Sequence, residues 1–160
     1  MTTFISNVPL WVVPLFIVLL ILGLRASKTR RVPIYVLYAL PLLGILTLRN
    51  IAALSPPSWI WILAALFYLV GFFFGMSWQR KWLVARGVHF VRLKGEWITL
   101  MAMMIIFIAG FVKGFLSDVA PNVAHSIGFA AVFAAVTCLP AGQFLGRVIT
   151  TLRAPITDTL

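Results

Sequence analysis

The sequence has few charged residues, and acidic residues are especially scarce. Charged residues make up 10% of the 160 residues, 62% are hydrophobic, and the acidic residues are Glu96, Asp118 and Asp158. An average soluble domain is about 25% charged and about 45–50% apolar. A chain of this length cannot hide so much apolar surface in a core of its own. The composition therefore excludes an ordinary soluble domain, and its high hydrophobicity excludes intrinsic disorder.

Motifs that carry catalysis or metal binding are missing as well. Cys138 is the single cysteine, so the chain can form neither an internal disulfide nor a C-x-x-C redox pair. The sequence contains no phosphate-binding loop, no nucleophile elbow and no zinc-protease motif. We therefore expect no catalytic residues, no bound metal, no cofactor and no enzymatic activity.

What the sequence does contain is long apolar runs. A helix that crosses a bilayer needs about 20 mostly apolar residues, since each residue covers about 1.5 Å of a hydrocarbon layer roughly 30 Å thick. Five such runs occupy residues 8–24, 33–54, 59–77, 97–116 and 123–146. The runs are continuous, whereas the strands of a membrane barrel alternate. The sequence therefore predicts an all-α membrane protein with five transmembrane helices in a single integral membrane domain, residues 1–160.

Prolines fit the ends of these predicted helices. Pro33 and Pro121 stand near the starts of two runs, where a missing N–H group costs nothing. Residues 55–58, with the sequence Ser-Pro-Pro-Ser, are typical of a tight turn between the second and third runs. We expect short connections at these places.

Basic residues are distributed unevenly between the connections. Of the thirteen Lys and Arg residues, all but Arg49 and Lys113 fall in the loop after the first run, in the linker at residues 78–96, or beyond residue 146. Positively charged connections stay in the cytoplasm. The pattern predicts an external N-terminus and a cytoplasmic C-terminus. It also predicts attraction to anionic lipids at the cytoplasmic face, and we expect no nucleic-acid partner.

The linker at residues 78–96 mixes basic and apolar residues. Gly87 divides it into two stretches with β-propensity, which favours a short hairpin at the cytoplasmic surface. An amphipathic helix lying in the membrane interface is the alternative.

Small residues indicate where helices pack closely. Gly-x-x-x-Gly motifs are formed by Gly71 with Gly75, Gly110 with Gly114, and Gly142 with Gly146. In the fifth run, a stripe at alternating spacings of four and three consists of Ala124, Gly128, Ala131, Ala135, Cys138 and Gly142. Small residues let helix backbones approach in lipid, where association depends on packing. We expect these faces to be buried within one chain, while contacts in a homo-oligomer or a larger membrane complex remain the alternative.

Arg49 and Lys113 are basic residues at similar depths near the outer ends of the second and fourth runs. Together they are candidates for binding an anionic ligand or a lipid headgroup outside the cell. The alternative for each residue is that its long side chain reaches the outer membrane interface to keep its charge in water.

Short motifs along the chain suggest a family. They are Leu22-Gly23-Leu24-Arg25, Lys28-Thr29-Arg30-Arg31, Leu40-Pro41-Leu42, Gly95-Glu96-Trp97, Phe107 to Lys113, and Gly142-Gln143-Phe144-Leu145-Gly146-Arg147. With them the chain resembles a family of small bacterial inner-membrane proteins of unknown function, distantly similar to CcdC-like membrane proteins. The resemblance covers most of the chain and implies a multi-pass protein of the bacterial cytoplasmic membrane with an odd number of helices. It transfers no catalytic residue.

The sequence therefore favours a non-enzymatic membrane subunit or accessory protein. A carrier or binding protein for an anionic or amphipathic ligand, using Arg49 and Lys113, is the alternative. A membrane enzyme is the least favoured class, because the residues of a catalytic centre do not gather at any one depth.

Overall fold

The computed structural model describes residues 14, 16–18, 20–21, 24, 30–33, 41–86, 90–93 and 97–156. Most of the predicted first span, residues 8–24, lies outside the described residues, as do both ends of the chain. The helices and strands below all belong to the described part.

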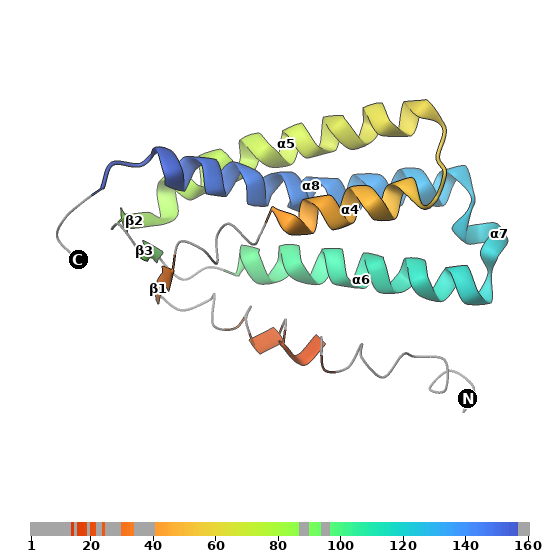
Figure 1. The fold of residues 1–160 in the computed structure, drawn as a ribbon, viewed down its shortest axis with the longest axis horizontal. Helices are drawn as coiled ribbons and strands as arrows, with labels where there is room; N and C mark the ends of the chain where they lie inside the picture. Colours follow the sequence, from red (N-terminus) through yellow and green to blue (C-terminus); the bar gives the residue numbers. More distant parts are fainter. Residues whose placement is uncertain are drawn as a thin grey trace.

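The described chain is mostly helical (Figure 1). Its helices are α4 (Leu42–Ala52), α5 (Ser58–Trp82), α6 (Ile98–Val119), α7 (Pro121–Ala124) and α8 (Ile127–Arg153). Among the described residues, three helices are long and apolar enough to cross a membrane, namely α5, α6 and α8. They correspond to the third, fourth and fifth predicted spans, which is consistent with a helical membrane protein.

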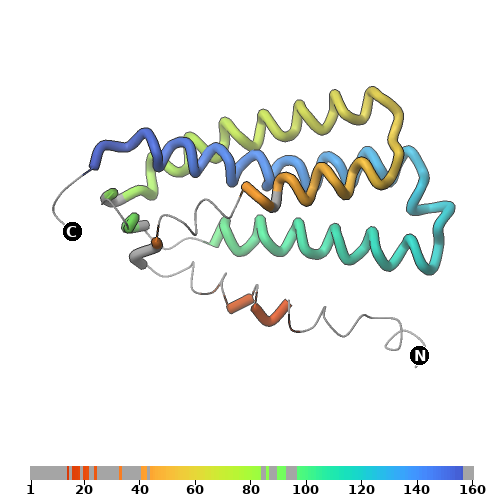
Figure 2. The backbone as a smooth tube through the Cα atoms, viewed as in Figure 1, coloured from red at the N-terminus to blue at the C-terminus, as the bar shows by residue number. Residues whose placement is uncertain are grey.

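Helix α8 is the central helix of the bundle. It contacts α5 along much of its length and also contacts α4, α6 and α7. Figure 2 shows α5, α6 and α8 running side by side, with α7 at one end of the bundle. We call this the α7 end, and the opposite end, where the strands lie, the sheet end. Because neighbours cover α8 from several sides, its side chains are more buried than those of α5 or α6.

A small sheet departs from the all-α prediction. In the described part of the chain, β1 (Arg30–Pro33), β2 (Leu83–Arg86) and β3 (Phe90–Leu93) form a three-stranded antiparallel sheet in the order β1-β3-β2. The pairing of β2 with β3 confirms the predicted hairpin. The third strand, β1, was not predicted.

Pro33 ends a strand, so the prediction that a helix begins there was wrong. Pro33 lies opposite Phe90 in the pairing of β1 with β3. Proline cannot donate a backbone hydrogen bond and is therefore found on edge strands, and β1 is an edge strand of this sheet. The second helix as described begins only at Leu42.

Two helices extend beyond their predicted ends. Helix α5 continues to Trp82 instead of residue 77, and α8 continues to Arg153 instead of residue 146. At about 1.5 Å per residue, both exceed a hydrocarbon layer of roughly 30 Å. The polar residues that the sequence assigned to connections are thus helical, and some of them face the other helix.

The apolar core lies toward the α7 end. It consists of Ile51, Leu54, Ile60, Ala64, Ala130, Phe133, Ala134 and Cys138. Toward the sheet end, by contrast, α8 buries polar and charged side chains. The bundle therefore has an apolar half and a polar half, and the candidate site lies in the polar half.

Candidate functional site

Close backbone contact between α5 and α8 fixes the position of the site. A Cβ atom added at Gly71 would lie 1.9 Å from the carbonyl oxygen of Leu139, and one added at Gly142 would lie 2.0 Å from that of Tyr68. Separations this short are impossible for a real side chain. Only glycine at these positions allows the two backbones to approach as they do.

The same relationship recurs one turn further along both helices. A Cβ atom added at Gly75 would lie 2.2 Å from the carbonyl oxygen of Gln143, and one added at Gly146 would lie 2.1 Å from that of Phe72. The Gly-x-x-x-Gly motifs of α5 and α8 therefore face each other within one chain. This is the close helix approach for which small residues are used in membranes.

The other predicted packing glycines occupy different surroundings. An added Cβ at Gly110, Gly114 or Gly128 would meet no atom of the described chain within 4 Å. Within the described residues these three glycines thus have no close packing partner, and their role in helix packing stays a prediction.

The small-residue stripe of the fifth run is buried in part, because Ala124, Cys138 and Gly142 are buried while Gly128 is exposed. Ala131 and Ala135 are half-buried, while their neighbours Ala130 and Ala134 are almost completely buried. At these two positions the buried face lies one residue, or about 100°, away from the stripe, whereas at Cys138 and Gly142 the stripe and the buried face coincide. Ala124 belongs to α7, so the stripe does not run along one continuous helix.

A buried polar cluster joins the three long helices at the sheet end. We define it as Gln79 on α5, Thr99 on α6, and Arg147 and Thr151 on α8. Arg147 donates from Nε to Oε1 of Gln79 at 3.0 Å and from Nη1 to Oγ1 of Thr99 at 2.7 Å. Gln79 donates from Nε2 to Oγ1 of Thr151 at 2.9 Å. One guanidinium thereby connects α8 to both α5 and α6.

The cluster is deeply buried. Arg147 is 3% exposed and Gln79 is 0% exposed. Removing a charge from water costs several kcal/mol in real proteins unless hydrogen bonds compensate it. The bonds to Gln79 and Thr99 supply part of this compensation, so they hold the side chain in a defined place. The arrangement rigidifies the sheet end of the bundle.

One turn before Arg147, the side chain of Gln143 is also buried. Its Nε2 group has no hydrogen-bond partner in the structure as described, and Gln143 is 3% exposed. A buried amide without a partner costs about 1–3 kcal/mol. Gln143 therefore weakens the polar half of the bundle.

The sequence assigned Arg147 to the cytoplasmic C-terminal end beyond the fifth run, and its burial was not predicted. A signal was present, because Gln143, Arg147 and Thr151 recur at spacings of four residues, which places them on one helix face. That signal becomes visible only if α8 is known to continue beyond residue 146.

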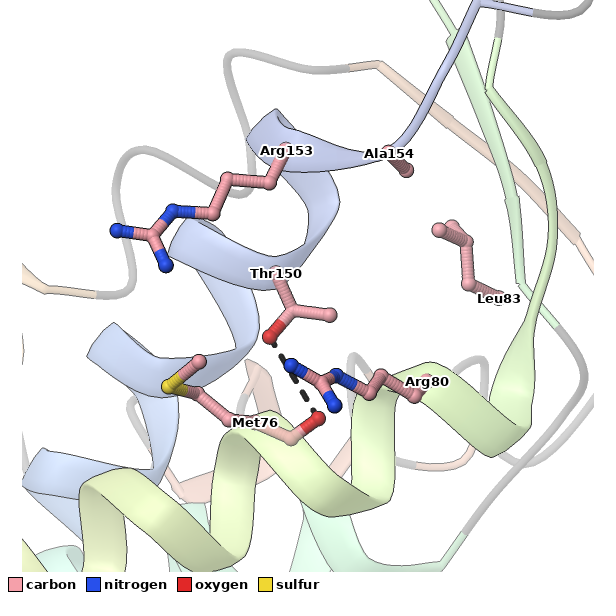
Figure 3. Close-up of a pocket in the computed structure, with 6 residues that line it drawn as sticks. All are labelled: Met76, Arg80, Leu83, Thr150, Arg153 and Ala154. Carbon is pink, nitrogen blue, oxygen red and sulfur yellow. Dashed lines mark hydrogen bonds between the residues drawn. The ribbon is translucent and has the colours of Figure 1, made fainter.

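Beside the cluster, the last turns of α5 and α8 enclose a pocket of about 300 Å³. It is lined by Met76, Arg80, Leu83, Thr150, Arg153 and Ala154 (Figure 3). In Figure 3, the Arg80 guanidinium lies near Thr150, and Arg153 extends from the last turn of α8. Both arginines are exposed. The pocket therefore combines two positive charges with an apolar lining.

A third arginine, on the sheet, forms hydrogen bonds with the end of α8. Arg86 of β2 donates from Nη1 to the carbonyl oxygen of Leu152 and, at 2.8 Å, to that of Ala154. The last carbonyl groups of a helix lack partners within the helix and carry partial negative charge. Arg86 therefore satisfies these groups and fastens β2 to α8.

The two cations predicted to form an anion site lie toward the α7 end. Lys113 is half-buried on α6 and donates from Nζ to Oδ1 of Asn50 on α4 at 3.2 Å. Arg49 precedes Asn50 on α4 and is exposed. The structure thus brings Lys113 to the residue next to Arg49, and a shared ligand for the two cations stays a prediction.

Within the described residues, no group of three His, Cys, Asp or Glu side chains could hold a metal ion. Comparison with protein-family models, with curated proteins and with solved structures found no match for the chain. The family resemblance suggested by the short sequence motifs therefore stays a prediction, and function has to be argued from the structure.

Proposed function

We propose that this protein is a non-enzymatic membrane subunit or accessory protein in a bacterial cytoplasmic membrane, and that its basic sheet end binds anionic lipid. The contrast between a rigid interior and an apolar outer surface of the described bundle carries the proposal. The α5–α8 pair is locked by glycine contacts and by the polar cluster, while apolar side chains project outward from the surrounding helices.

The exposed apolar surface supports a role in assembly within the bilayer. Large exposed side chains on α4 and α6 include Ile45, Leu48, Met101, Ile105 and Ile108. In a membrane, such faces meet lipid chains or the helices of another protein. Gly110 and Gly114 open a shallow strip on α6 where a second helix can approach.

Charge supports the orientation that we propose, with five spans, an external N-terminus and a cytoplasmic C-terminus. The sheet end carries Arg80, Lys81, Arg86, Arg92 and Arg153, and Arg49 and Lys113 lie toward the α7 end. Basic residues are retained in the cytoplasm. The sheet end accordingly faces the anionic lipids of the inner leaflet.

Thiol labelling tests the orientation. Asn122→Cys places an exposed thiol on α7, and Arg92→Cys places one on β3. In intact cells, an impermeant maleimide should label the Asn122→Cys variant, and the Arg92→Cys variant should react only after permeabilisation. The native Cys138 is 1% exposed and serves as the unreactive background. The reverse pattern would overturn the orientation.

Purification of the full-length protein in a mild detergent tests the functional class. We expect other membrane proteins to co-purify at a fixed ratio, together with anionic lipid enriched over its share in the membrane. A protein recovered alone, with lipids in the proportions of the bulk membrane, would contradict the proposal.

A further inference from the structure

We propose that the pocket between the last turns of α5 and α8 binds a phosphate group, with Arg80 and Arg153 as its ligands. This inference deepens the proposed function, on which it rests, because it gives lipid binding a defined site. It differs from the Arg49 and Lys113 prediction, which concerns the opposite end of the bundle.

The charges of the pocket have no partner among the described residues. Within the described residues, neither Arg80 nor Arg153 makes a hydrogen bond or an ion pair. The single acidic residue in the described part of the chain is Asp118, at the α7 end of α6. A guanidinium presents paired N–H donors that match the oxygens of a phosphate. In Figure 3 the two guanidinium groups point in different directions from α5 and α8, and because both side chains are exposed, they can turn toward one phosphate.

The depth in the membrane that we infer for the pocket is that of the lipid headgroups. Trp78 and Trp82 flank Arg80 on α5, and their rings stack with centroids 5.7 Å apart. Tryptophan is enriched at the level of the headgroups, because its ring is apolar while its N–H group stays near water. The guanidinium of Arg80 therefore lies at the depth where lipid phosphates are found.

The lining of the pocket suits the part of a lipid next to its phosphate. Met76, Leu83 and Ala154 provide apolar surface for glycerol and the first methylene groups. Thr150 donates its hydroxyl hydrogen to the carbonyl oxygen of Gly146 at 2.9 Å. The carbonyl oxygen of Met76 is a second acceptor for this hydroxyl at 3.5 Å (Figure 3), so the two guanidinium groups are the donors left for the phosphate.

A helix C-terminus normally repels an anion, and Arg86 removes this obstacle. The carbonyl groups of Leu152 and Ala154 carry the partial negative charge of the C-terminal end of α8, and Ala154 lines the pocket. Arg86 donates to both of them and adds a positive charge at the end of α8. The electrostatic surroundings thus favour an anion at the end of α8.

Two double variants distinguish binding at this pocket from general attraction to a basic surface. Arg80→Gln with Arg153→Gln removes two charges from the pocket. Lys81→Gln with Arg92→Gln removes two exposed charges at the same end of the bundle, outside the pocket lining. Full-length protein in neutral detergent is titrated with phosphatidylglycerol, and native mass spectrometry gives the dissociation constant of the first bound lipid.

We expect the pocket pair to weaken binding about 30-fold, because each substitution removes charge-assisted hydrogen bonds to the phosphate that contribute roughly fivefold. The matched pair removes only the screened attraction between exposed charges and an anionic headgroup, and should weaken binding by less than about fivefold. Equal losses in the two pairs would mean that only the overall charge matters, and would overturn the site. Unchanged binding in both pairs would also overturn it.

A steric variant tests the pocket without changing the charge. Ala154→Phe should fill the space beside Arg80 and weaken binding as the pocket pair does, while the Ala154 carbonyl group remains for Arg86. Wild-type affinity in this variant would place the lipid outside the pocket. Its thermal unfolding temperature, compared with that of the wild type, checks that the fold is retained.

Inorganic phosphate distinguishes the source of the bound group. Phosphate that displaces phosphatidylglycerol at millimolar concentration would identify a site for free phosphate. Phosphate without effect, beside tight lipid binding, would identify a headgroup site. Failure of this site leaves the co-purification test of the proposed function unaffected, so the two can fail separately.

Discussion

Arg147 of α8 and Gln79 of α5 form a hydrogen bond of 3.0 Å inside the bundle, between two side chains that are 3% and 0% exposed. A charged group is thereby buried where the long helices meet. Its position depends on residues from α5 and α6, which are far from Arg147 in the sequence. The first prediction concerns the coupling of these residues.

Replacing Gln79 with Met should destabilise the fold by about 2–3 kcal/mol, because a hydrogen bond to a buried charge is lost. Arg147→Met should destabilise it as well, since Gln79 and Thr99 lose their common donor. The double variant should lose less than the sum of the two, by about 1–3 kcal/mol. Unfolding in mixed detergent micelles measures these differences, with Arg153→Gln as an exposed control. Additive losses would show that the two residues do not act together.

The glycine contacts lead to a second prediction. Gly71→Ala and Gly142→Ala should each destabilise the fold by at least about 1–3 kcal/mol, because the new methyl group would overlap a backbone carbonyl of the other helix. Gly110→Ala is the matched control, since its methyl group would enter open space. Equal unfolding temperatures for all three variants would argue against the close α5–α8 contact.

The three Gly-x-x-x-Gly motifs show why sequence alone could not locate the contact. All three have the same local pattern, yet only those on α5 and α8 face another backbone within the described chain. The pattern states that a close approach is possible, while the partner depends on tertiary structure. The apolar runs were easier to interpret, because composition alone decides whether a helix can lie in lipid.

Long-range pairing explains the other differences between prediction and structure. The hairpin of β2 and β3 was predictable, because its strands are neighbours in the sequence. The edge strand β1 pairs with a strand that follows α4 and α5, so its local sequence gives no sign of the pairing. The sequence placed Arg147 in the cytoplasmic C-terminal end for a similar reason, since its burial depends on residues of two other helices.

A third prediction concerns the unpaired amide of Gln143. Gln143→Met should stabilise the fold by about 1 kcal/mol, because it removes a buried donor that has no partner in the described structure. Gln79→Met is the same change of residue type on α5 and should have the opposite sign. Unfolding of the two variants side by side provides the test. Destabilisation by Gln143→Met would indicate that the amide has a partner in the membrane.

The contact of Arg86 with the end of α8 gives the fourth prediction. Arg86→Gln should free the carbonyl groups of Leu152 and Ala154 and let the last turn of α8 open more often. Amide hydrogen exchange in this turn should become about fivefold faster, as expected for a loss of about 1 kcal/mol. Arg92→Gln, on the neighbouring strand, should leave the exchange unchanged. Equal exchange rates in both variants would contradict the fastening role of Arg86.

The strand order β1-β3-β2 sets a sequence of events during synthesis. The centre of the sheet is its last strand to be made, so β1 leaves the ribosome without its partner and waits while α4 and α5 are translated. Only when β3 emerges can the sheet close, and only when α8 follows can Arg86 fasten β2 to its end. The contacts of the sheet end can therefore be completed only after α8 has been synthesised, so this end of the bundle is the last to be finished.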